Sequence, residues 1–411
     1  MRVLLIHKLY EYTGGAEVFF RETERVLRAN GHDTWLIATG TPAADEPENL
    51  SRLTAPDYKS DSLLTKILDI PKSIYDLRKR TQVKAIIQEY KPDIVHLFSM
   101  NVHLTPAVID AACDENIPLV GTFNDYRHIC PNYKLFQNNQ LCKQCKGGKF
   151  YNTVLNKCAK NSLGLSVASA AEAYVHQYMD VYGKFDHFTF SSDFLASTTQ
   201  EFWPNREISW SKLRNPFESR SFMRSMQDDG YILYFGRIIE EKGVDRLIEA
   251  AELLPDIPFK IVGDGPDYQP LQQVVRDRGL TNVEFLGPKW GNELFPILDS
   301  ARAVVVPSIW HENFPYVINQ AFSIGKPVIG SDRGGIPELV DNGVRGLIFD
   351  PNNVAELAAC IRRLYGDPAE AKKMGDAAKA YSDDIFNDEV FYKDIMSAYE
   401  WTLDAHNSHR R

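Results

Sequence analysis

Two series of short apolar runs, separated by helical patterns, constrain the fold of this chain more than any other feature. In the first half the runs are RVLLI at 2–6, DTWLIA at 33–38, DIVHLFS at 93–99, PLVGTF at 118–123 and HFTFSS at 187–192. In the second half they are YILYFGR at 231–237, FKIVGDGP at 259–266, VEFLG at 283–287, ARAVVVPS at 301–308, PVIGS at 327–331 and RGLIF at 345–349. Buried strands that alternate with helices form parallel sheets with right-handed crossovers. The sequence therefore predicts an α/β protein with two doubly wound, Rossmann-like domains.

The boundary between the two domains is expected within residues 195–230, where turn-forming stretches interrupt the periodicity. We assign residues 1–215 to the first domain, with a cysteine-rich insertion at about 126–162, and residues 216–387 to the second. Residues 388–411 are predicted to form a closing C-terminal helix.

The composition is that of a globular protein that does not cross a membrane. Of the 411 residues, 44% are hydrophobic and 25% are charged, and no run of eighteen apolar residues occurs. The N-terminal apolar run is only four or five residues long and no small-residue cleavage site follows it. No signal peptide is therefore expected, and the cytoplasm is the expected compartment.

The net charge of −9 is spread unevenly along the chain. Residues 1–215 hold 25 Lys and Arg against 24 Asp and Glu, whereas the remainder holds 21 against 31. Residues 52–91 carry nine basic and five acidic side chains, and residues 126–171 carry seven basic and no acidic ones. Two domains with unrelated surfaces would explain this, but the pattern also predicts a first domain that contacts an anionic acceptor or membrane surface. No module for stacking on bases or reading a groove is recognisable, so nucleic acid is not an expected partner.

Two cations follow the first strand of the second series, in YFGRIIEEKG. In parallel sheets ligands bind beyond the carboxyl ends of the strands, so Arg237 and Lys242 are placed to bind a pyrophosphate. The alternative is a solvated loop in which both cations pair with Glu240 and Glu241.

Paired glycines occur at several expected strand ends. Gly236, Gly263 and Gly265 would let the backbone approach a ligand closely, although tight turns would use the same residues. Gly14 and Gly15 open the first helix, where backbone N–H groups can face an anion.

The stretch WHENFPYVINQA at 310–321 follows another strand, and its helix is expected to start near Pro315. Glu312 would lie at the mouth of the site, and Gln320 would share a helix face with Tyr316 and Val317. Backbone amides in this stretch would hold a diphosphate, and the two polar side chains would bind hydroxyls. The residues assigned to donor binding here are Asn313, Phe314, Tyr316, Val317 and Gln320. The alternatives are a solvent-facing Gln320 and aromatic side chains that belong to the core.

Taken in order, FGR…EKG, VGDGP, FLG, the stretch PSIWHENFPYVINQAFSIGKPVIGSDRGGIPELV and the N-terminal GGAE resemble the motifs of the retaining glycosyltransferases of family 4. The variant here is of an ENFP type with a four-cysteine insertion. The resemblance implies a GT-B fold, in which two Rossmann-like domains face a cleft and the C-terminal helix crosses back to the first domain.

The resemblance also implies roles for particular residues. Arg237 and Lys242 would bind the diphosphate of a UDP- or GDP-sugar without a catalytic divalent metal, and the absence of a D-x-D triplet agrees with this. Glu312 would contact the hydroxyls of the donor sugar, and Gln320 would contact the ribose. Gly14 and Gly15 would line the cleft from the first domain.

Two positions depart from the family pattern. The family usually has a second Glu where this chain has Gln320, and an amide would bind ribose less strongly, by about 1 kcal/mol. It often has His-Asp where this chain has Asn124 and Asp125, which we include among the catalytic residues. If a proton carrier is needed there, Asp125 or His128 would have to supply it.

Four of the six cysteines lie close together, with the spacing C-x11-C-x2-C-x12-C. Cys130, Cys142, Cys145 and Cys158 could close a structural zinc site, and nearby lysines would favour their thiolates. An iron–sulfur cluster and free or redox-active thiols are the alternatives.

The expected function is transfer of a sugar, with retention, to a glycan or polyprenyl-linked acceptor. Two other readings stay open. One is another GT-B enzyme such as a nucleotide-sugar epimerase, and the other is a non-catalytic nucleotide-sugar-binding protein, which Gln320 and Asn124 motivate.

Overall fold

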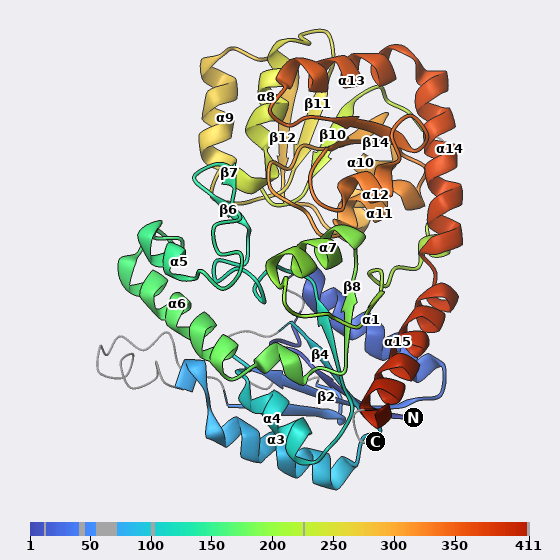
Figure 1. Cartoon of the computed structure of the whole chain (residues 1–411). Coiled ribbons are helices and arrows are strands. Elements are labelled where there is room, and N and C mark those ends of the chain that lie inside the picture. Colours follow the sequence, from blue (N-terminus) through green and yellow to red (C-terminus); the bar gives the residue numbers. More distant parts are fainter. Residues whose placement is uncertain (12–13, 41–45, 55–71, 100–102, 225–226, 409–411) are drawn as a thin grey trace. The chain divides into compact units, whose positions relative to one another are not determined.

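The computed structural model describes residues 1–11, 14–40, 46–54, 72–99, 103–224 and 227–408. The chain divides into two compact units (Figure 1). The first unit comprises residues 1–137, 142–216 and 391–411, and the second comprises residues 138–141 and 217–390.

The first unit is built on a seven-stranded parallel sheet in the order β3-β2-β1-β4-β5-β8-β9. Its strands are β1 (Arg2–Ile6), β2 (Asp33–Thr39), β3 (Leu50–Leu53), β4 (Ile94–Phe98), β5 (Leu119–Phe123), β8 (His187–Phe190) and β9 (Trp210–Lys212). Apart from this sheet, β6 (Phe136–Gln137) pairs with β7 (Gln140–Leu141), whose residues are counted with the second unit. The strand order reverses between β1 and β4, as in doubly wound folds.

Most helices of the first unit lie between its strands in the chain, and the last one follows the second unit. They are α1 (Gly15–Ala29), α3 (Leu77–Tyr90), α4 (Ala107–Asp114), α5 (Tyr151–Leu155), α6 (Leu163–Tyr178), η1 (Val181–Lys184), α7 (Asp193–Phe202) and the C-terminal α15 (Asp388–Ser408). Helix α1 follows from its sequence, because Phe19, Phe20, Val26 and Leu27 form one buried stripe and Gly31 ends it with a positive φ of 79°.

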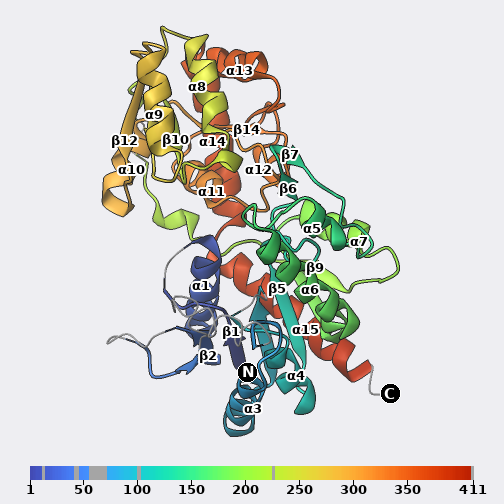
Figure 2. The same cartoon turned by 90° about the vertical axis from the view of Figure 1, so that its left-hand side faces the viewer.

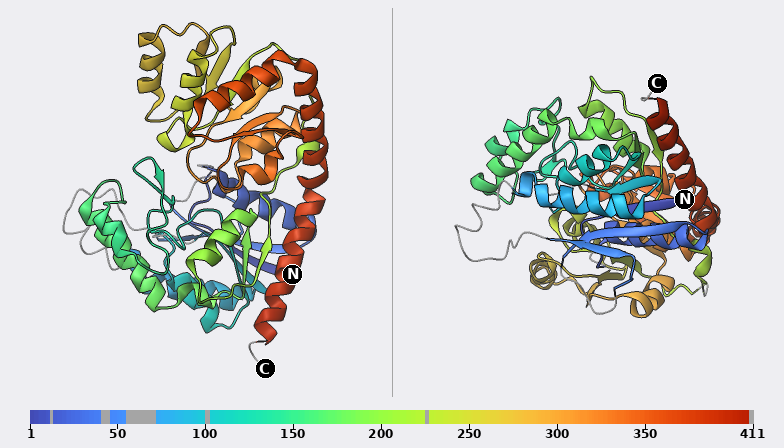
Figure 3. Two further views of the ribbon diagram at one scale, coloured as in Figure 1. Left: turned by 45° about the horizontal axis from the view of Figure 1, so that its top comes forward. Right: turned by 90° about the horizontal axis from the view of Figure 1, so that it is seen from below.

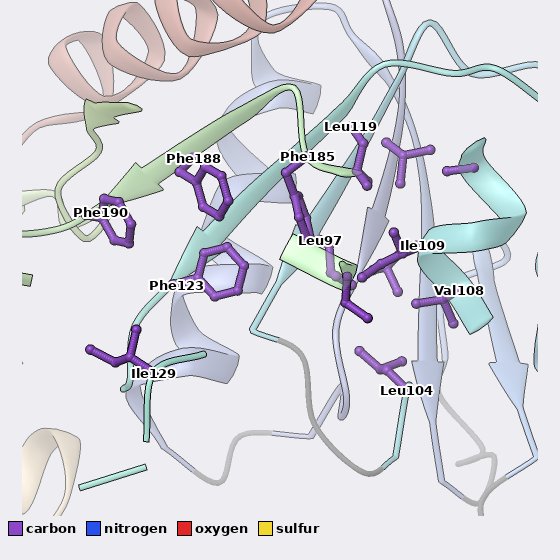
Figure 4. Packing of buried hydrophobic residues seen from close by; sticks show 14 of the residues in the cluster. Leu97, Leu104, Val108, Ile109, Leu119, Phe123, Ile129, Phe185, Phe188 and Phe190 are labelled. Atoms are coloured by element: carbon purple, nitrogen blue, oxygen red, sulfur yellow. The ribbon is translucent and has the colours of Figure 1, made fainter. Parts of the chain in front are cut away.

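A core of aliphatic and aromatic side chains packs against this sheet (Figure 4). Phe123 of β5 contacts Phe185, Phe188 and Phe190 with ring centroids 5.5, 5.5 and 6.4 Å apart. Phe188 and Phe190 alternate along β8, as expected for a strand that turns one face to the core, and Phe185 lies just before this strand.

Helix α15 returns to the first unit, as the fold class predicts. Its buried side chains Phe391, Ile395 and Tyr399 pack in one core cluster with residues of β1 and α1. Phe391 meets Phe19 of α1 edge to face at 6.0 Å, and the two helices lie beside each other (Figures 2 and 3). The Tyr399 hydroxyl also hydrogen-bonds the His96 ring in β4 at 2.9 Å.

The second unit has a six-stranded parallel sheet in the order β12-β11-β10-β13-β14-β15. Its strands are β10 (Ile232–Phe235), β11 (Phe259–Val262), β12 (Val283–Gly287), β13 (Ala303–Val306), β14 (Val328–Ser331) and β15 (Gly346–Phe349). Its helices are η2 (Ser219–Ser221), η3 (Glu240–Lys242), α8 (Val244–Glu252), α9 (Tyr268–Asp277), α10 (Gly291–Asp299), α11 (Tyr316–Ser323), α12 (Ile336–Val340), α13 (Val354–Gly366) and α14 (Pro368–Ile385). Here the order reverses between β10 and β13, which makes this edge the expected ligand site.

Candidate active site

Sequence-predicted residues of the second unit gather at the point where its strand order reverses. Gly236 and Arg237 directly follow β10, and the loop that contains Glu312 follows β13. Because β10 and β13 are neighbours in the sheet, residues 70 or more positions apart in the chain meet at one edge. We call these loops the strand-end site.

Glu312 is the buried centre of the strand-end site, with only 5% of its surface exposed. Its Oε1 accepts hydrogen bonds from Lys242 Nζ at 2.5 Å, from Ser308 Oγ at 2.7 Å and from Trp310 Nε1 at 2.9 Å. The sequence places Glu312 and Lys242 in one site but gives them separate tasks, whereas the structure shows them as a direct ion pair.

The charge of Glu312 depends on these partners. Burial opposes ionisation, but the nearby Lys242 ammonium and the three hydrogen bonds outweigh burial and lower the pKa of Glu312 below its ordinary value. The carboxylate is therefore charged at neutral pH although it is almost inaccessible to water.

Glycines bring the loops of this site into direct backbone contact. Gly263 and Gly265 have φ values of 146° and 155°. A Cβ atom on Gly263 would lie 1.8 Å from the carbonyl oxygen of Gly236, and one on Gly265 would lie 2.1 Å from that of Ile238. Glycine is thus required at both positions by space as well as by backbone conformation.

The loop after β13 is fixed from two sides. The N–H of Ile309 donates to the carbonyl of Glu241 at 3.0 Å, and the N–H of Gly335 donates to the carbonyl of Glu312 at 2.7 Å. A Cβ on Gly334 would lie 2.0 Å from that same carbonyl oxygen. Gly334 was not among the predicted site residues, although the paired glycines of SDRGG are a signal for such a close approach.

Arg237 differs from Lys242 because its side chain is exposed. Within the described residues, its guanidinium has no hydrogen-bonding or ion-pairing partner, so the alternative of a loop neutralised by Glu240 and Glu241 is not what the structure shows for this residue. Its backbone carbonyl accepts a hydrogen bond from the Tyr234 hydroxyl at 2.6 Å. Arg237 therefore offers a fixed backbone and five free N–H donors.

Helix α11 begins at Tyr316, close to the predicted start, but Pro315 is its N-cap and not its first helical residue. Of the residues assigned to donor binding, Gln320 is half-buried on this helix and Asn313 is buried just before it. The side chains of Phe314 and Val317 belong to a core cluster, so any ligand contact they make would come from the backbone. Asn319, which the sequence did not single out, is fully buried in α11, and both of its amide atoms lack partners among the described residues.

In the first unit, Gly14 is the N-cap of α1 and Gly15 its first residue. Glu17 in the first turn is buried and pairs with Lys8 at 3.4 Å. A carboxylate thus already lies at this helix start.

Asn124 and Asp125 directly follow β5. The Asn124 N–H reaches Ser99 Oγ at 3.5 Å, and its side-chain oxygen is buried without a partner among the described residues. Asp125 accepts the N–H of Arg127 at 3.0 Å. Burial raises the pKa of Asp125, and the opposing effect of Arg127 does not cancel it. Of these two neighbours, Asp125 is therefore the candidate for a proton carrier, because the Asn124 amide does not titrate.

His128 is not suited to that task. It is buried among aromatic rings, its Nε2 is 2.7 Å from Thr199 Oγ1, and burial lowers its pKa to about 3. His7, for which no role was predicted, follows β1 and stacks on Phe20 at 5.3 Å, and burial lowers its pKa to about 4.

The four clustered cysteines line one small pocket and are all free thiols. Throughout the described ranges, however, no group of three or more His, Cys, Asp or Glu side chains is arranged to hold a metal ion. The structure thus gives no support to the predicted zinc site at Cys130, Cys142, Cys145 and Cys158, nor to an iron–sulfur cluster.

The electrostatics of this pocket also correct an expectation. Burial raises the pKa of Cys130 and Cys158 to about 11 instead of favouring thiolates. Lys143 and Lys146, which were expected to stabilise thiolates, pair with Glu201 at 2.7 and 3.2 Å.

Two family models match the chain, one on each unit. The model described as Glycosyltransferase Family 4 matches residues 13–208, and the one described as Glycosyl transferases group 1 matches residues 217–381. Together they identify a GT-B glycosyltransferase of the family 4 type. This agrees with the strand orders and with the family resemblance of the motifs.

Similar proteins include several glycosyltransferases. An uncharacterized glycosyltransferase of Methanocaldococcus jannaschii is 33% identical over 38% of this chain and 44% of its own length. The alpha-D-kanosaminyltransferase of Streptomyces kanamyceticus is 31% identical over 37% of this chain and 41% of its own. Both matches thus span less than half of those relatives. A GDP-mannose-dependent alpha-mannosyltransferase of Corynebacterium glutamicum is 28% identical over 86% of this chain and 77% of its own.

Solved structures confirm the GT-B fold. Sucrose-phosphate synthase from Thermosynechococcus elongatus matches with a TM-score of 0.70 and 18% identity, covering 98% of this chain and 99% of that one. HepE of Anabaena in complex with UDP also matches with a TM-score of 0.70 and 18% identity, over 97% of this chain and 100% of that one. Among the helices that the structure describes, none is long and apolar enough to cross a membrane.

Proposed function

We propose that this protein is a retaining glycosyltransferase that moves a sugar from a nucleoside-diphosphate sugar to a glycan or lipid-linked saccharide, in the synthesis of cell-surface polysaccharide or glycolipid. The observation that carries the proposal is the buried Glu312–Lys242 pair at the strand-end site, beside the exposed Arg237. A fixed carboxylate beside cations suits a ligand with hydroxyls at one end and a diphosphate at the other.

The reaction breaks the bond between the anomeric carbon and a diphosphate oxygen. Arg237 and Lys242 would neutralise the charge that develops on the leaving diphosphate, a role that does not require a divalent ion. Glu312 would accept hydrogen bonds from the donor sugar and position it, and Gln320 would bind the ribose. Retention would follow from attack on the face that the diphosphate leaves, with a diphosphate oxygen taking the acceptor proton.

The donor base is proposed as uracil or guanine. HepE was solved with UDP, and the Corynebacterium relative is named for GDP-mannose. These names support a nucleotide sugar and leave the choice of base to experiment.

The test is a panel of UDP- and GDP-sugars, scored by thermal shift and by slow hydrolysis of the donor. We expect at least one donor to stabilise the protein and to be hydrolysed, and Arg237→Ala to abolish both effects. Arg276→Ala, which removes an exposed arginine of α9, is the matched control. If no nucleotide sugar binds, or if Arg237→Ala behaves like the control, the proposal fails.

The non-catalytic alternative rests on the neutral side chains of Gln320 and Asn124. It predicts that a nucleotide sugar stabilises the protein but that neither the wild type nor Gln320→Glu turns it over. The same panel therefore separates a binding protein, or an epimerase that isomerises its donor, from a transferase.

We further propose that the first domain contacts an anionic membrane surface on the cytoplasmic side. Leu163, Val167, Tyr174 and Tyr178 of α6 recur at helical spacing and are 55%, 49%, 41% and 93% exposed. Lysines flank this apolar stripe, and residues 126–171 contain no acidic side chain. An exposed apolar stripe with flanking lysines is typical of a helix that lies in a membrane interface. The other basic stretch, residues 52–91, lies partly outside the described residues, because residues 55–71 are not described.

Vesicle binding tests this contact. We expect co-sedimentation with vesicles that contain phosphatidylglycerol, weaker binding to vesicles of phosphatidylcholine alone, and loss of binding in Val167→Asp. Leu253→Asp, at an exposed leucine of the second unit, is the control. Equal binding of the two variants would rule out the α6 stripe as the contact.

A metal in the cysteine pocket remains a separate proposal. The shared lining of one pocket by all four thiols motivates this proposal, although no group of three or more His, Cys, Asp or Glu among the described residues is arranged to hold a metal ion. About one equivalent of zinc in protein purified without chelators, and its loss in Cys142→Ser, would support the proposal. If the purified protein is free of metal and fully stable, the proposal of a metal site is refuted.

A further inference from the structure

A cavity lies beneath α6 in the described part of the first unit, and none of the residues assigned to the donor site line it. It has a volume of about 260 Å³ and is lined by parts of the cysteine-rich segment, α6, η1 and the segment after α7. Pockets for drug-sized ligands run from about 300 to 1,000 Å³, so this cavity suits a ligand of about one sugar ring.

One ring nitrogen of a buried histidine in the cavity wall lacks a hydrogen-bond partner among the described residues. His176 of α6 is 7% exposed, and no described residue bonds its Nε2. A hydrogen bond with the backbone of Ile74 holds the ring. A buried polar atom without a partner is destabilising unless a ligand or water completes it. Nη1 of Arg206, which also lines the cavity, lacks a partner within the described residues as well.

The charges around the cavity are compensated. Arg206 pairs with Asp180, and Arg127 pairs with Glu172 at 3.7 Å. Burial lowers the pKa of His176 to about 4, so this imidazole is neutral at pH 7. An anion such as a phosphate group would therefore meet little uncompensated positive charge, whereas hydroxyl groups would find both donors and acceptors.

Aromatic and amide side chains complete the lining. Trp203 and Tyr182 are half-buried with rings 5.4 Å apart, and the Arg206 guanidinium lies over the Trp203 ring at 5.4 Å. Gln177 adds an amide from the next position of α6. Apolar ring faces with a few placed polar groups are the usual lining of a small-molecule site.

We propose that this cavity binds one uncharged sugar residue of the acceptor glycan, as a carbohydrate subsite of the first domain. The assignment of the sugar to an acceptor rests on the proposed transferase function, whereas binding of a sugar does not. Occupancy would complete the hydrogen bonds of His176 and Arg206 and fix the acceptor to the first domain before transfer.

Saturation-transfer NMR with neutral methyl glycosides of glucose, galactose, mannose, rhamnose and N-acetylglucosamine tests the proposal on the full chain. We expect at least one glycoside to bind and inorganic phosphate not to displace it. Ala173→Trp fills the cavity from α6 and should abolish binding, whereas Ala171→Trp, on the exposed face of the same helix, should leave it unchanged.

His176→Phe provides a second variant that keeps the ring and removes its polar atoms, and at least tenfold weaker binding is expected. Circular dichroism establishes that each variant is folded. The proposal is overturned if no glycoside binds, if phosphate competes, or if folded Ala173→Trp binds as the wild type does. UDP and GDP binding are measured on the same samples. Sugar binding without nucleotide binding would refute the proposed transferase function and support the subsite. Nucleotide binding without sugar binding would refute the subsite and leave the transferase function standing.

Discussion

In the first domain the polar side chains buried in and around the sheet include five histidines that are neutral at pH 7, whereas the second domain buries a charged carboxylate. Burial lowers the pKa of His96 and His128 to about 3 and that of His7, His176 and His187 to about 4. In the second domain Lys242 and three hydrogen bonds keep Glu312 ionised against the same effect of burial. The sequence of the second unit contains only one histidine, His311.

The two interiors thus differ in whether their buried titratable side chains are neutral or charged. A charge that is held in place by a partner is ready to meet a charged ligand without reorganisation, which suits a donor site. Neutral imidazoles add no charge to the interior of the first domain, but they make its stability depend on pH. The two domains should therefore respond differently to acid, to substitution and to ligands.

The largest expected effect is unfolding of the first domain in acid. The five histidines have a pKa of 6.5 when unfolded and about 3 to 4 when folded, so the folded state takes up fewer protons in this range. Each histidine then costs up to about 1.4 kcal/mol of stability per pH unit as the pH falls from 6.5 towards 4. Five together are comparable with the whole stability of a domain, about 5 to 15 kcal/mol.

Hydrogen exchange measured by mass spectrometry at pH 7, 6 and 5 checks this expectation. Peptides of the first domain should lose protection before those of the second, which serves as the internal control. Loss of protection in both domains at one pH, or in the second domain first, would contradict the comparison.

The next effect concerns the charged pair of the second domain. Lys242→Met leaves Glu312 buried without its cation, so we expect the pKa of Glu312 to rise and donor turnover to fall by about 10²- to 10³-fold. The double variant Lys242→Met with Glu312→Gln should regain stability, because no buried charge is left unpaired, but not activity.

Measurement of kcat/KM and of the free energy of unfolding for both variants separates these effects. Lys372→Met, which removes a half-exposed ion pair with Asp376, is the control and should change stability by less than about 1 kcal/mol. Full activity of Lys242→Met would remove this residue from the proposed mechanism.

A smaller effect tests the backbone contacts of the strand-end site. Gly263→Ala would force a Cβ to 1.8 Å from the Gly236 carbonyl oxygen, so we expect a loss of about 3 kcal/mol of stability. Gly279 also has a positive φ, of 63°, but open space around it, so Gly279→Ala should cost only about 1 kcal/mol. Urea titration monitored on the second domain compares them, and equal losses would show that backbone conformation alone requires glycine at position 263.

The smallest expected effect is at Gln320. Gln320→Glu should strengthen donor binding by about 1 kcal/mol, or roughly fivefold in Kd, if this side chain bonds ribose. Titration calorimetry with UDP and GDP measures the change, with Gln273→Glu on the exposed side of α9 as the control. An unchanged Kd would mean that Gln320 does not contact the nucleotide.

Much of the second domain could be predicted because its signals are local. Each strand end carries its own glycine or charged residue, and the rules of parallel sheets place those ends at one edge. What could not be predicted is the direct pairing of Lys242 with Glu312, because it depends on how two loops 70 residues apart are packed.

The first domain was harder to predict because distant residues decide the state of each group. His128 lies in a promising loop, but Phe190 and Trp203 bury it and exclude it from proton transfer. The lysines of the cysteine-rich segment were expected to act on the thiols, but Glu201 of α7 pairs with two of them. The cavity beneath α6 has no sequence signature, because its walls come from segments up to 80 residues apart.

The position of α15 at the end of the chain affects how the protein folds during its synthesis on the ribosome. The first domain includes residues 391–411, and Tyr399 packs in its core and bonds His96 of the sheet. Residues 1–216 therefore leave the ribosome without a part of their own core, and about 170 further residues are made before it arrives. At about 5 to 20 residues per second this delay is on the order of 10 to 35 s. During that time the second domain can fold and the first cannot finish, so the domain that is synthesised first is completed last.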